Sequence, residues 1–111
     1  MIFHICTEVA WQDALKAGTY LGDMLQSHGF IRCSTVDQIV EVANHIFLDT
    51  HGLMLLVIDE TAVTERVAYE DAGNGKLHPH IYGPLPLASV IIAIPFPPQA
   101  DGTFVLPASL G

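Results

Sequence analysis

Apolar residues recur along one segment of the chain at the spacing of an amphipathic helix. Residues 36–48 carry them at i, i+3, i+4 and i+7, and Thr35 with Gln38 has the spacing of a capping box. Another helix is expected from Thr7, a favoured N-cap residue, through about Ala17. The pattern therefore predicts two helices in the first half of the chain.

Short apolar segments around these helices have the composition of strands. The run L-M-L-L-V-I over residues 53–58 is continuous rather than alternating, which is typical of a central strand covered on both faces. The segment over residues 89–94 is expected to be a last buried strand. The predicted strands are residues 1–6, 30–34, 53–58, 66–70 and 89–94. Because helices and strands do not alternate regularly, we expect an α+β fold with a mixed, mostly antiparallel sheet of five to six strands.

The length and composition fit one folded unit. The chain has 111 residues, 50% of them hydrophobic, with a mean hydropathy of +0.42, and we read residues 1–111 as a single domain. Residues 94–111 contain four of the seven prolines. This segment is therefore expected to be an extended C-terminal strap, with at most a short edge strand over residues 103–106.

The charge balance restricts the partners. Four Lys and Arg residues stand against 12 Asp and Glu residues, and the net charge of −8 argues against a nucleic-acid partner. No apolar run approaches the roughly 18 residues of a membrane span, and the N-terminus lacks the pattern of a secretory signal. Cys6 and Cys33 lie outside any C-x-x-C pair and are expected to remain thiols. We therefore expect a cytoplasmic protein that binds neither nucleic acid nor membrane.

Strand alternation predicts a polar cleft. Four apolar side chains of the first two strands are expected to line the core: Phe3, Ile5, Ile31 and Cys33. Their neighbours His4, Arg32 and Ser34 then project together, and Glu70 of the strand over residues 66–70 completes the cleft.

The segment H-P-H-I-Y-G-P-L over residues 78–85 is the densest in groups capable of chemistry. His78, His80 and Tyr82 share a face if the segment is extended. Two interpretations remain open. In one, the prolines stiffen a crossing loop whose His80 and Tyr82 side chains bond backbone carbonyls; in the other, these side chains belong to a functional site.

Four motifs together resemble the domain-of-unknown-function 952 family, small bacterial proteins of about this length. They are I-F-H-I at residues 2–5, H-G-F-I-R-C-S at 28–34, V-A-Y-E at 67–70 and the segment at 78–85. The resemblance covers residues 1 to about 94. That family is grouped by fold with the ADP-ribosyltransferase-like superfamily, which implies a split, curved β-sheet gripping NAD in a central cleft.

The resemblance also implies roles for individual residues. His4 matches the first-strand histidine that hydrogen-bonds the ribose hydroxyls of NAD, and Phe30 and Ser34 match groups that flank the nicotinamide ribose. Glu70 or His80 would steady an oxocarbenium-like centre. The candidate catalytic residues are thus His4, Glu70 and His80, and the candidate cofactor-binding residues are Phe30, Arg32, Ser34 and Tyr82.

Two positions depart from the family pattern. Arg32 stands where the family has His, and His28 where it often has Asp. Arginine cannot act as a base near neutral pH, although it can hold a pyrophosphate with a bidentate fork. The change puts a mechanism with two histidines in doubt and leaves phosphate binding intact.

Three functions follow as alternatives. The first is a nucleotide-binding domain that binds NAD or ADP-ribose, either as an ADP-ribosyl or related transferase or as a binder alone. The second is an interaction module or homodimer with an incidental polar cleft, which the apolar surplus, acidic surface and proline strap favour. The third is a metal site of His78, His80 and either His4 or Glu70, although H-x-H is a weak signal and no metal is expected.

Overall fold

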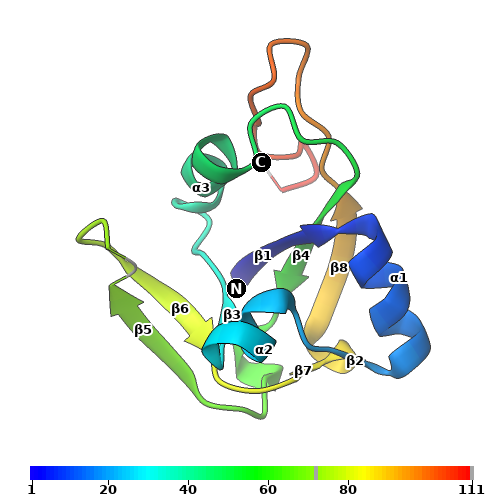
Figure 1. Cartoon of the computed structure of the whole chain (residues 1–111), viewed down its shortest axis with the longest axis vertical. Coiled ribbons are helices and arrows are strands. Elements are labelled where there is room, and N and C mark those ends of the chain that lie inside the picture. The colour runs from blue at the N-terminus through cyan, green and yellow to red at the C-terminus, as the bar shows by residue number, and fades with distance from the viewer. Residues whose placement is uncertain (72, 111) are drawn as a thin grey trace.

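The computed structural model describes residues 1–71 and 73–110 and confirms the α+β class (Figure 1). The helices are α1 (Glu8–Ala17), α2 (Asp23–His28) and α3 (Ile39–Ile46), with 3-10 turns at Glu60–Ala62 and Leu87–Ser89. The strands are β1 (Ile2–Thr7), β2 (Thr19–Tyr20), β3 (Ile31–Arg32), β4 (Leu53–Ile58), β5 (Val67–Asp71), β6 (Leu77–Ile81), β7 (Leu85–Pro86) and β8 (Val90–Pro95). Within the described residues there are thus three α-helices where the sequence predicted two.

The strands form several antiparallel sheets instead of the expected single sheet of five to six strands. In the described residues the orders are β1-β4-β8, β3-β6-β5 and β2-β7. The break between the first two sheets lies just after β3. Ile31 and Arg32 pair with β6, the Cys33 N–H donates to the Pro79 carbonyl of β6, and Ser34 then forms an isolated bridge with Phe3 of β1. The predicted strand over residues 30–34 is therefore divided between two sheets.

The central strand β4 is buried on both faces, as its continuous apolar run predicted. Leu56 and Ile58 pack in one core cluster with Trp11 of α1, and Leu55 and Val57 pack on the other side in a second cluster. Ile39 and Ala43 of α3 belong to that second cluster. Two core clusters thus lie on opposite faces of the β1-β4-β8 sheet.

The edge strand β8 departs from the prediction of a last buried strand. Ile91 is 57% exposed and Ile92 is 49% exposed. The pairing with β4 is irregular at this point, since Ile92 lies opposite Val57 and Val90 lies opposite Ile58. β8 is therefore only partly covered, because this strand lies at the border of its sheet.

Local sequence signals explain where the helices begin and end. Thr7 caps α1 as predicted, since its hydroxyl accepts from the Ala10 backbone N–H at 3.0 Å. The helix α3 is shorter than the predicted 36–48. The Thr35 N–H donates to the Gln38 side chain at 3.0 Å, which holds residues 36–38 in a turn. Beyond α3, Asp49 has a left-handed φ of 59°, so the chain reverses.

The short helix α2 is absent from the sequence prediction. It follows Gly22 and ends at Gly29, whose φ of 83° is the left-handed conformation typical of a helix C-cap. Six residues contain too few apolar positions to show a helical period.

The C-terminal strap is anchored by two phenylalanines rather than by an edge strand. Phe96 and Phe104 are buried with ring centroids 4.9 Å apart, and residues 103–106 are not a strand. The Asn44 side chain of α3 accepts from the Phe104 N–H at 2.6 Å and donates to its carbonyl at 3.3 Å. The strap thus fixes α3 against the sheet. Residue 111 of the strap lies outside the described residues.

Candidate functional site

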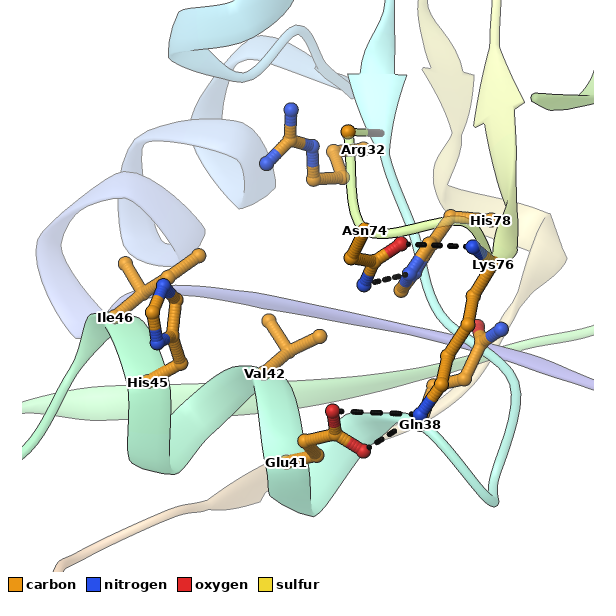
Figure 2. Close-up of a pocket in the computed structure, with 10 residues that line it drawn as sticks. Arg32, Gln38, Glu41, Val42, His45, Ile46, Asn74, Lys76 and His78 are labelled. Atoms are coloured by element: carbon orange, nitrogen blue, oxygen red, sulfur yellow. Dashed lines mark hydrogen bonds and ion pairs between the residues drawn. The ribbon is translucent and has the colours of Figure 1, made fainter. Parts of the chain in front are cut away.

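Two adjoining cavities open beside β1. The β1 cavity, of about 410 Å³, lies between β1, the start of β3 and α3, and is lined in part by Phe3, His4, Tyr20, Ser34 and Phe47. The α3 cavity, of about 450 Å³, lies between α3 and the turn that leads into β6 (Figure 2), and is lined in part by Glu41, His45, Asn74, Lys76 and His78. Both cavities are lined by Arg32, Val42 and Ile46. Arg32 therefore stands where the two meet.

His4 joins three strands at the wall of the β1 cavity. Its Nδ1 is 2.6 Å from the Arg32 backbone carbonyl, and its Nε2 is 2.7 Å from the Tyr20 hydroxyl. A carbonyl oxygen can only accept, so Nδ1 carries a proton and donates to it. His4 therefore holds β3 and β2 against β1 and fixes the backbone of Arg32.

The β3-β6-β5 sheet gathers its polar side chains on one face. Arg32 of β3 and Ala68 of β5 both lie opposite His80, and Glu70 lies opposite His78. Directly opposed residues of antiparallel strands project to the same face, as do residues two apart on one strand. Arg32, His78, His80 and Glu70 thus share a face.

A cluster around Glu70 lies at the end of this face. Its Oε1 accepts a short hydrogen bond from the Tyr82 hydroxyl and is 3.0 Å from Nδ1 of His80. Phe30 stacks on the His80 ring with centroids 4.2 Å apart, and the Arg66 guanidinium lies 4.5 Å from the centre of the Tyr82 ring. The bonds from Tyr82 and His80 lower the pKa of Glu70, and the bond to Glu70 raises the pKa of Tyr82. Glu70 is therefore held ionised.

Three buried nitrogen atoms on this face have no hydrogen-bond partner among the described residues: Arg32 Nε, His78 Nδ1 and His80 Nε2. His78 and His80 are only 3% and 4% exposed. Buried polar groups are normally satisfied, and unsatisfied ones need an explanation such as a ligand or ordered water. Burial lowers the pKa of His78, and the nearby charge of Arg32 lowers it further. His78 is therefore held neutral.

Comparison with known proteins identifies the family. A family model described as "Protein of unknown function (DUF952)" matches residues 5–93. The chain belongs to this family. Among solved structures it is similar to the crystal structure of Protein CC0527 from Caulobacter crescentus, with a TM-score of 0.86 and 27% identity over 95% of this chain and 93% of that one. The chain is also similar to the solution NMR structure of CC0527, with a TM-score of 0.81 and 27% identity over 92% of this chain and 89% of that one. No curated protein matches.

This DUF952 chain distributes the predicted site residues over two places. His4, Arg32 and Ser34 line the β1 cavity. Phe30, Glu70, His80 and Tyr82 form the neighbouring cluster and line neither cavity. Of the four residues expected in one cleft, His4, Arg32 and Ser34 thus line one cavity, and Glu70 lies outside it in the neighbouring cluster.

Several lining residues were not predicted. Tyr20 lies in a two-residue strand between two glycines, and Asn74 and Lys76 lie in the turn before β6. The glycines that flank them were the available signal, since glycine-rich turns near a strand end commonly shape a site.

The remaining predictions concern a metal site, a membrane span and the two cysteines. Residues 1–71 and 73–110 include no group of three or more His, Cys, Asp or Glu side chains that could hold a metal ion, so the histidine metal hypothesis gains no support. In the same residues no helix is both long and apolar enough to cross a bilayer.

Cys6 and Cys33 are buried free thiols. Burial raises the pKa of Cys6 to about 12 and raises that of Cys33 as well, which makes both poor nucleophiles.

Proposed function

We propose that this DUF952 protein binds a nucleotide-like anionic small molecule, NAD or ADP-ribose, across the β1 and α3 cavities. The observation that carries the proposal is the position of Arg32, where the two cavities meet, with a buried Nε–H that no described group accepts. A guanidinium is always charged and matches phosphate oxygens with its fork of donors. Arg32 is thus suited to the anionic centre of such a ligand.

The size and lining of the cavities support this ligand class. Small-molecule sites commonly occupy about 300–1,000 Å³ and are mostly apolar with a few polar groups. The β1 cavity fits that description, because Phe3, Ile5 and Phe47 stand beside His4 and Tyr20. Arg32 and Lys76 are two of the four Lys and Arg residues in a chain of net charge −8. An anionic ligand is therefore favoured at this point of an otherwise acidic molecule.

His4 has a positioning role in this proposal. The superfamily resemblance implies a direct bond from this histidine to ribose hydroxyls, but both of its ring nitrogens already lie within hydrogen-bond distance of protein groups. His4 instead fixes Arg32 and orients the Tyr20 hydroxyl at the cavity wall.

A transferase activity would need the Glu70 cluster to face the ligand. Glu70 is ionised through Tyr82 and His80, and a fixed carboxylate stabilises positive charge that develops at a sugar carbon. Because Phe30 covers His80 and neither residue lines a cavity, binding is the function that we propose first, and ADP-ribosyl transfer is its extension.

Isothermal titration calorimetry with ADP-ribose and with NAD tests the proposal. The unchanged protein and Lys16→Gln are expected to bind, because Lys16 lies on α1 and lines neither cavity. Arg32→Gln, which removes the same charge, is expected to weaken binding by roughly tenfold or more, as loss of a charged hydrogen bond does. Equal affinities in the two variants would overturn the assignment of Arg32.

One feature favours the second function, a homodimer. The border strand β8 exposes Ile91 and Ile92 and carries no charged side chain over Val90–Pro95. An antiparallel strand can pair with its own copy across a two-fold axis, which makes the contact self-complementary. Light scattering of the unchanged protein and of Ile91→Lys would show a dimer that the variant loses, and a monomer at all concentrations would refute this function.

A further inference from the structure

The α3 cavity contains polar groups that the proposed function does not yet use. Figure 2 shows Glu41, Val42 and His45 of α3 on one side and Asn74, Lys76 and His78 on the other, with the Arg32 guanidinium above them. His78 is 3% exposed, and its Nδ1 has no partner among the described residues. Such a buried, unpartnered group at a cavity wall points to a ligand that the cavity takes up.

The hydrogen bonds of Asn74 determine which His78 nitrogen carries the proton. The Asn74 side-chain oxygen accepts from the Lys76 backbone N–H at 3.0 Å, so the amide nitrogen points to Nε2 of His78, 3.4 Å away. An amide nitrogen can only donate, and Nε2 must therefore accept. In the neutral ring the proton then lies on Nδ1. Arg32 Nε and His78 Nδ1 are thus two buried N–H donors with no acceptor among residues 1–71 and 73–110.

The charges around the cavity also favour an anion. Glu41 is the acidic group in its wall, and Lys76 Nζ lies 3.1 and 3.4 Å from its two carboxylate oxygens. That pairing leaves the charge of Arg32 uncompensated by any ion pair found in the described residues.

We propose that the α3 cavity is an oxyanion subsite in which Arg32 Nε and His78 Nδ1 donate to the oxygens of a phosphate or carboxylate group. The inference rests on the proposed function for the identity of the whole ligand, whose anionic part would occupy this subsite. The oxyanion chemistry itself can be tested separately with small anions. His78 becomes a residue that selects ligands by their anionic group.

The surroundings of His78 keep its ring in the neutral form that donates from Nδ1. Burial and the charges of Arg32, His80 and Lys76 lower the pKa of His78, while Glu41 raises it by a smaller amount. A second proton would lie on Nε2, which faces the donating amide nitrogen of Asn74. His78 is therefore expected to bind the anion as a neutral donor, without proton uptake.

The experiment is a calorimetric titration with inorganic pyrophosphate and, separately, with succinate, in two buffers of different ionisation enthalpy. The full chain is compared with His78→Gln and with His51→Gln, whose residue is exposed and lines neither cavity. The subsite predicts binding of at least one anion without proton uptake, a loss of about tenfold in affinity for His78→Gln, and no change for His51→Gln. Tighter binding of pyrophosphate would show that the subsite takes a phosphate group, and tighter binding of succinate would show that it takes a carboxylate group.

Equal affinity of His78→Gln and the unchanged protein would overturn the subsite, as would the absence of binding of both anions at millimolar concentration. If His78→Gln does not fold, the test uses NMR spectra of the unchanged protein, in which the signals of the histidine rings are followed. Pyrophosphate must then shift a buried histidine, and no shift refutes the inference. If ADP-ribose binds equally well to His78→Gln, the subsite fails while the proposed function stands. If pyrophosphate binds and neither ADP-ribose nor NAD does, the proposed function fails while the subsite stands.

Discussion

Replacement of Phe104 by alanine tests whether the C-terminal strap supports the site. Phe104 is 1% exposed, packs on Phe96, and belongs to the core cluster that includes Ile39 and Ala43 of α3. Removing a buried phenylalanine side chain typically costs about 3–5 kcal/mol. The variant Phe104→Ala should therefore lose much of the stability of a domain of this size, which is of the order of 5–15 kcal/mol.

The expected change in melting temperature follows from the chain length. An unfolding entropy of about 2.1 cal/mol/K per residue over 111 residues gives about 0.23 kcal/mol/K. A loss of about 3–5 kcal/mol then lowers the melting temperature by roughly 13–21 °C. Circular dichroism during heating, with urea unfolding as a second measurement, records this change.

Val105→Ala is the matched control, because Val105 is the next residue in the strap and is 54% exposed. Its melting temperature should change little, since exposed substitutions usually stay within about 0.5 kcal/mol. Equal effects of the two substitutions would show that the strap is not packed on α3. The reasoning would also fail if Phe104→Ala unfolded normally at the temperature of the unchanged protein.

Two other predictions concern titratable groups. Cys6 and Cys33 should not react with a thiol reagent near pH 8 in the native protein and should both react after unfolding, because their pKa values are raised by burial; rapid reaction of the native protein would contradict this. The pKa of His78 is lowered below its ordinary 6.5 in the folded state. Because the unfolded chain therefore gains this proton first as the pH falls, the stability of the native state declines below about pH 6.5. Urea unfolding at about pH 7 and about pH 5 should show a smaller decline for His78→Gln than for the unchanged protein, and an equal decline would contradict it.

The sequence predicts the parts of the fold that local physical rules determine. The Thr7 cap begins α1, and the continuous run over residues 53–58 becomes the doubly covered β4. It does not predict the division into several sheets, because that depends on Ser34 pairing with Phe3 across 31 residues of chain. Hydrophobic alternation reports which face of a strand is buried, and it carries no information on which strand lies beside it.

The candidate site shows the same limit. Alternation correctly places His78 and His80 on one face of β6, since that depends on the pleat alone. It could not show that Glu70 lies on the same face, because that depends on the pairing of β5 with β6. The α3 cavity could not be found from sequence, since it depends on α3 and the turn before β6 coming together in space.

Heating the unchanged protein with and without NAD or ADP-ribose tests the central claim most directly. A ligand present at about 100 times its dissociation constant adds about 2.7 kcal/mol, which at about 0.23 kcal/mol/K for 111 residues raises the melting temperature by roughly 12 °C. We expect such a rise with at least one of the two ligands, and expect Arg32→Gln to lose it while Lys16→Gln keeps it. Unchanged melting with both ligands at millimolar concentration would contradict the nucleotide-binding function.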